Sequence, residues 1–125
     1  MRLLADSHVL VWWLDDPSRL SPKARAAIAD PENEVFFSAA SVWELGLKIA
    51  RGKLLMPADF VDTLRKDGFS DLAVTIDHAD ASLFLPRHHG DPFDRMLVAQ
   101  ALEEGLVLVS RDGAIADYEV PLLKA

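Results

Sequence analysis

The sequence of 125 residues contains no cysteine. Disulfide frameworks, zinc sites built from thiolates and a cysteine nucleophile are therefore excluded. Long apolar runs are also missing: a membrane-spanning helix needs about 20 apolar residues, whereas the longest uncharged stretch, 35–43, is far shorter and contains serines. Asp6 interrupts the apolar N-terminus where a signal peptide would need its hydrophobic region. These absences predict a soluble, cytoplasmic protein.

Basic residues are few. Lys and Arg number 13 against 20 Asp and Glu, so the formal net charge is −7. This balance argues against an ordinary basic nucleic-acid binder, which uses Lys and Arg to displace counterions from phosphates. Half of the residues are hydrophobic, so a chain of this length can bury a core. The sequence shows no linker or repeat, and we expect a single domain over residues 1–125.

Short apolar segments that predict strands alternate with segments that predict helices. The strands are expected at 3–5, 34–37, 72–76, 106–109 and 120–123. The helices, counted from their capping or first residue, are expected at 7–14, 21–28, 41–51, 57–66, 77–85 and 91–104. Strands separated by helices imply parallel crossovers, so the predicted fold class is α/β, a three-layer α/β/α sandwich with a central, mostly parallel sheet.

Two carboxylates directly follow predicted strands. Asp6 comes after the strand at 3–5, and Asp112 lies in the turn after the strand at 106–109. Because ligands of such sheets bind beyond the carboxyl ends of the strands, this placement indicates a functional site. Each residue also has a structural explanation, Asp6 as a helix N-cap or turn residue and Asp112 as a turn residue before glycine.

Two further carboxylates lie near the start of predicted helices. Asp94 begins the core-facing stripe of its helix, where an unpaired charge is costly, and Asp91 already fits the N-cap position there. A favourable place in the helix dipole, or an arginine partner, would also explain Asp94. Glu44 fits the third position of a capping box opened by Ser41, and it could pair with Lys48 one turn later.

The four carboxylates together indicate a metal site. If the strand ends and helix starts meet at one edge of the sheet, four unneutralised carboxylates would repel each other, and a divalent cation would compensate them. Ligation by oxygen alone suits Mg²⁺ or Mn²⁺ better than zinc. Such an ion polarises a phosphodiester and activates water, so the arrangement predicts metal-assisted phosphodiester hydrolysis.

The motifs that carry these residues run in a fixed order along the chain. They are Asp6 after the first strand, Ser41-x-x-Glu44, Asp91-Pro92-Phe93-Asp94-Arg95-Met96-Leu97-Val98-Ala99 and Ser110-Arg111-Asp112. In this order the motifs resemble those of the PIN-domain nucleases, and more narrowly the VapC toxins of bacterial type II toxin–antitoxin modules. The resemblance covers nearly the whole chain.

The resemblance implies an Mg²⁺-dependent endoribonuclease, with Mn²⁺ as an alternative metal. It implies that metal-activated water cleaves RNA to leave a 5′-phosphate and a 3′-hydroxyl, and that the catalytic and metal-binding residues are Asp6, Glu44, Asp94 and Asp112. It further implies a cognate antitoxin protein and a homodimer or toxin–antitoxin hetero-oligomer. Two alternatives stay open: an RNA-processing PIN nuclease outside toxin biology, and a non-catalytic PIN-fold module that binds RNA or protein.

Four neighbours of the carboxylates are supporting candidates. Ser7 and Ser110 could hydrogen-bond a metal-bound water or a phosphate, or each could instead cap the helix that follows it, and for Ser7 we favour the cap. Arg95 and Arg111 could hold RNA phosphate or fix a neighbouring carboxylate, and for Arg95 we favour the second role.

The remaining candidates concern contacts with RNA or partners. A small basic patch after Glu44 is a candidate RNA contact, or an ordinary solvated helix end, and consists of Lys48, Arg51 and Lys53. His88 and His89 could also approach RNA from their loop. Adjacent Trp12 and Trp13 cannot share a narrow helical stripe, so one of them lies on a partner surface or both are buried between helices.

Overall fold

The computed structural model describes residues 1–88 and 90–125. Its centre is a five-stranded parallel sheet with the strand order β3-β2-β1-β4-β5. The strands are β1 (Arg2–Ala5), β2 (Glu34–Ser38), β3 (Ser70–Leu72), β4 (Val107–Ser110) and β5 (Leu122–Lys124). In the register of the sheet, Leu4 of β1 lies between Phe36 of β2 and Leu108 of β4.

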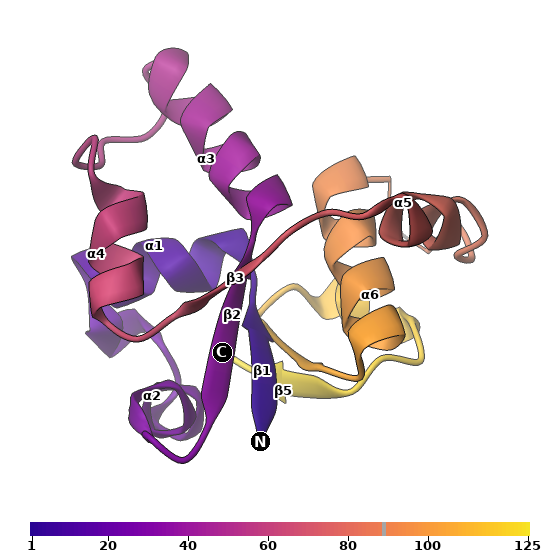
Figure 1. Ribbon diagram of the computed structural model, residues 1–125, viewed down its shortest axis with the longest axis horizontal. Coiled ribbons are helices and arrows are strands. Elements are labelled where there is room, and N and C mark those ends of the chain that lie inside the picture. The colour runs from indigo at the N-terminus through magenta and orange to yellow at the C-terminus, as the bar shows by residue number, and fades with distance from the viewer. Residues whose placement is uncertain (89) are drawn as a thin grey trace.

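Helices cover both faces of this sheet, with α1, α2 and α4 on one side and α5 and α6 on the other (Figure 1). The helices are α1 (Ser7–Asp15), α2 (Pro22–Ala29), α3 (Ala39–Ala50), α4 (Phe60–Lys66), α5 (Ile76–Leu83) and α6 (Pro92–Glu104). Two short 3-10 helices are η1 (Pro17–Arg19) and η2 (Gly113–Asp117). In the part of the chain that is described, no helix has the length and apolarity needed to cross a membrane. The predicted three-layer α/β/α fold is confirmed.

The side chains of β1 alternate between two buried layers, as the period of a strand requires. Leu3 and Ala5 pack in one cluster with residues of α1, α2 and α4, such as Leu64. Leu4 points to the opposite face and packs with residues of α6, such as Leu97. Because β1 is buried on both faces, its sequence is continuously apolar rather than alternating.

Asp6, rather than Ser7, caps α1. The Oδ1 atom of Asp6 accepts a hydrogen bond from the backbone N–H of Val9 at 2.9 Å. The prediction that Ser7 serves as the cap is wrong by one residue, because β1 ends at Ala5 and the helix begins without an intervening loop. This frees the Ser7 hydroxyl for another contact.

Three other helix starts test the predicted caps. Ser21 and Asp91 cap α2 and α6 as expected, each followed by proline. The predicted capping box of Ser41 and Glu44 is wrong, since β2 runs to Ser38, whose side chain accepts from the N–H of Ala40 at 3.0 Å. Ser41 and Glu44 therefore lie inside α3.

The later elements are also shifted from their predicted positions. The strand expected at 72–76 is β3 at Ser70–Leu72, and Thr75 caps α5 in place of Asp77. The helix expected from Pro57 begins at Phe60, and the last strand lies at Leu122–Lys124. The parallel register decides these boundaries, because Ser70 must lie opposite Phe36 of β2.

We expect the substitution Leu97→Ala to destabilise the fold strongly. Leu97 is 1% exposed between α6 and the sheet, so the truncation leaves a cavity and should cost about 2–5 kcal/mol. Leu55 is 95% exposed, and the matched Leu55→Ala variant should change stability by less than about 0.5 kcal/mol. Urea unfolding followed by circular dichroism measures both values, and equal losses would contradict the packing of α6 on this face.

Candidate metal centre

The carboxyl ends of β1 and β4 form the point where the chain switches from one side of the sheet to the other. The chain passes from β1 to β2 on one side, and β4 pairs with β1 on the other. Crevices at such points are the usual ligand sites of open α/β sheets. Asp6 follows β1 and Asp112 follows β4, and both line one pocket of about 290 Å³ together with His8, Trp12 and Arg111.

Asp6 is the most buried carboxylate of this edge, at 3% exposure. Burial raises its pKa, and the nearby Glu44 adds to the rise, while hydrogen bonds from the Ser110 hydroxyl and the Val9 N–H oppose it. Within the described chain, Asp6 forms no ion pair. A bound cation would stabilise its ionised form, because an opposite charge compensates the loss of hydration.

Ser110 connects the two strand-end carboxylates. Its fully buried hydroxyl hydrogen-bonds the Asp6 carboxylate and accepts from the backbone N–H of Asp112 at 3.1 Å. The side chain of Asp112 in turn accepts from the N–H of Ala114 at 2.9 Å and begins η2. Ser110 is thus linked to both strand-end carboxylates, while its contact with a metal-bound water or a phosphate stays a prediction.

Glu44 is held by two partners. The Ser7 hydroxyl donates to its Oε1 atom at 2.5 Å, and the Lys48 ammonium lies 3.3 Å from its Oε2 atom. Glu44 is 7% exposed, so both contacts act on a largely dehydrated carboxylate. Ser7 thus ties the start of α1 to α3 and places Glu44 within electrostatic reach of Asp6.

Asp94 lies in the first turn of α6 and is half-buried. Its backbone N–H donates to the N-cap residue Asp91 at 3.2 Å, which confirms the structural role predicted for Asp91. The same turn packs against α3, because the rings of Phe93 and Trp43 meet with centroids 5.3 Å apart. The helices that carry Asp94 and Glu44 are therefore neighbours.

The donor set fits a hard cation. All four predicted ligands offer carboxylate oxygens, the atoms that Mg²⁺ and Mn²⁺ prefer. Within residues 1–88 and 90–125, no group of three or more His, Asp and Glu side chains has the spacing of a metal site. The structure brings Asp6 and Asp112 into one pocket, and ligation of a cation by all four carboxylates stays a prediction.

Similarity to known proteins identifies the family to which this chain belongs. A model described as "PIN domain" matches residues 3–121. The chain belongs to the PIN-domain family. Ribonuclease VapC22 of Mycobacterium tuberculosis is 30% identical to it over 122 residues, which cover 95% of this chain and 93% of that protein.

Solved structures show the same fold. The VapBC2 structure from Rickettsia felis, bound to a promoter DNA fragment, matches with a TM-score of 0.73 at 12% identity over 99% of this chain and 98% of that one. The FitAcB structure from Neisseria gonorrhoeae matches with a TM-score of 0.64 at 22% identity over 97% and 96% of the two chains. At these identities the likeness concerns the fold of the PIN domain alone.

Arg95 of this PIN domain does not contact a neighbouring carboxylate in the described chain, contrary to the predicted role. Its guanidinium donates to three backbone carbonyls and one hydroxyl, those of Ser82, Leu85, Pro86 and Tyr118, at 2.8–3.2 Å. Ser82 lies in the last turn of α5, Leu85 and Pro86 lie in the connection between α5 and α6, and Tyr118 follows η2. Arg95 therefore holds the loop that leads into α6.

Arg111 also has a role that the sequence did not predict. Its guanidinium donates to the backbone carbonyls of Arg19 and Ala125, and it stacks over the ring of Trp12 at 4.2 Å from the centroid. The side chain lines the pocket of Asp6 while its hydrogen bonds fix the C-terminus. Trp12, a residue of α1, is half-buried, and this arginine covers its ring.

The predicted basic patch is divided between two environments. Lys48 pairs with Glu44, the structural alternative that the sequence allowed. Arg51 and Lys53 are exposed beyond the end of α3, and Arg51 lies about 10 Å further along the helix axis than Glu44. Contact of this patch with RNA stays a prediction.

The loop histidine and the paired tryptophans lie in different environments. His88 is exposed and packs edge-on against Tyr118, whereas His89 lies outside the described residues. Both Trp12 and Trp13 pack against the core, and the Trp13 indole donates to Asp67 at 3.0 Å.

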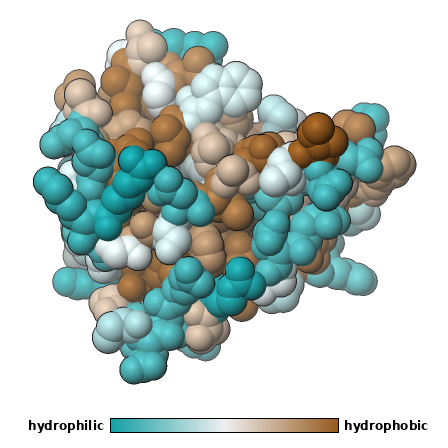
Figure 2. Space-filling view, viewed as in Figure 1, coloured by the Kyte–Doolittle hydropathy of each residue, from teal (hydrophilic) through white to brown (hydrophobic). Residues whose placement is uncertain are grey.

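The exposed tryptophan is Trp43, at 65% exposure, which sequence reasoning missed. It lines an apolar groove of about 570 Å³ between α3 and α6. Figure 2 shows apolar side chains gathered across the middle of this face, with polar ones at its edges. The exposure of Trp43 beside the buried Glu44 is decided by how α3 packs and not by a pattern in the sequence.

We expect the Asp6→Asn variant of this PIN domain to be more stable than the wild type without divalent metal. The raised pKa means that ionised Asp6 opposes folding at neutral pH, and asparagine keeps the cap on Val9 without the charge. A relief of about 1 kcal/mol would raise the Tm by roughly 4 °C in a domain of this size.

Calorimetry in EDTA measures this difference at several pH values. The gain should be largest near pH 7 and shrink as the pH falls and Asp6 of the folded wild type becomes protonated. An Asp6→Asn variant that is less stable than the wild type at pH 7 would contradict the cost assigned to this buried charge. Exposed Asp80→Asn on α5 is the control and should leave the Tm unchanged.

Proposed function

We propose that this PIN domain is an Mg²⁺-dependent endoribonuclease and the toxin of a type II toxin–antitoxin module, acting in the cytoplasm. The observation that carries the proposal is the buried Asp6 carboxylate, which shares a pocket with Asp112 at the switch point of the sheet. The 30% identity to Ribonuclease VapC22 over 95% of the chain supports RNA as the substrate.

The acidic residues would hold one or two Mg²⁺ ions, with Asp6 and Asp94 as central ligands and Asp112 beside them. The bound ion supplies charge that polarises the phosphodiester and lowers the pKa of water. Glu44 accepts the proton of the attacking water, and the Ser7 and Lys48 contacts keep its carboxylate in place. The water oxygen bonds to phosphorus as the bond from phosphorus to O3′ breaks, and O3′ takes a proton from solvent, which leaves a 5′-phosphate and a 3′-hydroxyl.

The proposed partner is an antitoxin protein. The solved structures of similar fold include VapBC complexes from Rickettsia felis and Salmonella typhimurium and a VapBC toxin–antitoxin system, VapBC-5, from Mycobacterium tuberculosis. The groove of Trp43 offers an apolar surface beside the helices that carry Glu44 and Asp94. We propose that an antitoxin and a second copy of the chain cover apolar surface of this kind in the assembled module.

Cleavage assays on single-stranded RNA test the enzyme. Asp6→Asn, Glu44→Gln, Asp94→Asn and Asp112→Asn should each lower the rate by on the order of 100-fold or more in Mg²⁺, because each removes a ligand or the proton acceptor. Asp80→Asn removes an exposed carboxylate of α5 and should cleave as the wild type does. Circular dichroism establishes that each variant is folded.

Three results would contradict this function. They are equal cleavage by the wild type in Mg²⁺ and in EDTA, undiminished cleavage by Asp6→Asn, and products that end in a 3′-phosphate. RNA binding without cleavage in either Mg²⁺ or Mn²⁺ would instead favour the non-catalytic binding module.

A further inference from the structure

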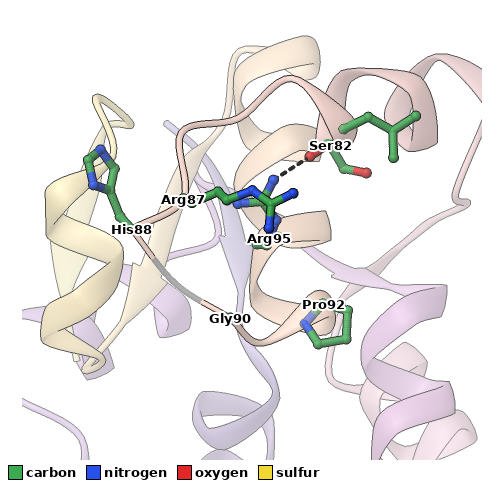
Figure 3. A pocket seen from close by; sticks show the side chains of 7 residues that line it. Ser82, Arg87, His88, Gly90, Pro92 and Arg95 are labelled. Atoms are coloured by element: carbon green, nitrogen blue, oxygen red, sulfur yellow. Dashed lines mark hydrogen bonds between the residues drawn. The ribbon is translucent and has the colours of Figure 1, made fainter.

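A third cavity, of about 540 Å³, lies where α5 and the start of α6 meet. It is formed by α5, the loop after it and the first turn of α6, and its lining includes Ser82, Arg87, His88, Pro92 and Arg95. Figure 3 shows the Arg87 and Arg95 side chains extending toward the same space. In a chain of net charge −7, two guanidinium groups in one cavity are a marked local excess of positive charge.

No carboxylate of the described chain pairs with Arg95 in this cavity. The acceptors of its hydrogen bonds are carbonyls and the Tyr118 hydroxyl, all of them neutral groups. Such acceptors fix the orientation of a guanidinium but do not cancel its field. Because Arg95 is half-buried, water screens that field less than at an open surface.

Arg87 is exposed and forms no ion pair with the described residues. Two guanidinium groups that share a cavity repel each other unless an anion lies between them. Pro92, the first residue of the 13-residue helix α6, also lines the cavity. The Asp91 carboxylate caps the N–H groups of this helix end, so the positive charge of the cavity comes from its two arginines. The cavity therefore favours an anion.

The cavity and the proposed metal centre share the first turn of α6. Pro92 and Arg95 line the cavity, and Asp94 lies between them in the same turn of α6. Three residues of an α-helix span only about 4.5 Å along its axis. At about 100° of rotation per residue, Asp94 projects from another side of the helix than Pro92 and Arg95, so the cavity and the acidic residues lie on either side of this turn.

We propose that this cavity is a phosphate subsite, in which Arg87 binds the RNA backbone across the first turn of α6 from the acidic residues. Arg87 supplies a guanidinium that can grip a phosphate with two parallel hydrogen bonds, and Arg95 supplies fixed positive charge behind it. The inference rests on the proposed ribonuclease function, since it names how the same site holds its substrate. It also explains how an acidic protein retains RNA, because the attraction is local.

Binding of a fluorescein-labelled single-stranded RNA, measured by anisotropy, tests the subsite apart from catalysis. The measurement uses the Asp6→Asn protein in Mg²⁺ so that the RNA stays intact. Adding Arg87→Ala should weaken binding about tenfold at low salt and reduce the slope of log K against log salt by about 0.7, the value for one phosphate contact in single strands. Arg87→Lys should recover part of the affinity, because it keeps the charge but loses the planar fork.

Arg25 on α2 provides the matched control, since it is an exposed arginine on another part of the molecule. Arg25→Ala should leave both affinity and salt slope unchanged. In the active protein, Arg87→Ala should raise KM about tenfold and leave kcat within about twofold, the pattern for lost uniform binding.

The outcomes separate this inference from the proposed function. Normal RNA affinity, salt slope and KM for Arg87→Ala in a protein that cleaves RNA would overturn the subsite and leave the nuclease intact. A wild type that neither binds nor cleaves RNA in Mg²⁺ would overturn both. RNA binding that depends on Arg87 without any cleavage would support the subsite and overturn the nuclease.

Discussion

The parallel pairing of β1 with β2 on one side and β4 on the other is the constraint on which the site depends. Leu4 is in register with Phe36 and Leu108, and the Asp6 N–H donates to the Val109 carbonyl at the end of this ladder. This pairing aligns the carboxyl ends of strands that are about a hundred residues apart in sequence, and so it brings Asp6 into one pocket with Asp112. A one-residue shift in the pairing of β1 with β4 would separate Asp6 from Asp112 and turn core residues of β1 outward.

Acidic and basic side chains of the chain gather in different parts of the molecule. Asp6 is buried where a carboxylate is costly and Glu44 is held by Ser7 and Lys48, whereas Arg87 and Arg95 gather on the far side of the first turn of α6. Acidic and basic groups thus lie on either side of one helix end. The net charge of −7 does not describe the local charge on either side of this helix end, because salt screens the field of each group of charges over a short distance.

Local patterns predicted the fold well where one signal acted alone. Proline after Ser21 and Asp91 marked two helix starts correctly, and the apolar strands were found within one or two residues at β1, β2 and β4. The patterns failed where two residues competed. Asp6 and Ser7 could both cap α1, as Ser38 and Ser41 could both cap α3, and strand length decided between them. Strand length depends on pairing partners that a local pattern does not contain.

The sequence by itself determined the alternation of strands and helices. It also determined that all the predicted metal ligands are carboxylate oxygens, and the order of these residues along the chain, because these features follow from residue type and spacing. The tertiary structure alone decided that Ser7 holds Glu44 across 37 residues, that Ser110 joins Asp6 to Asp112, and that Arg95 serves a loop rather than a carboxylate. The physical reason is that each of these contacts depends on strand order and helix packing. Residues far apart in sequence come into contact only when the strands that carry them pair in the sheet.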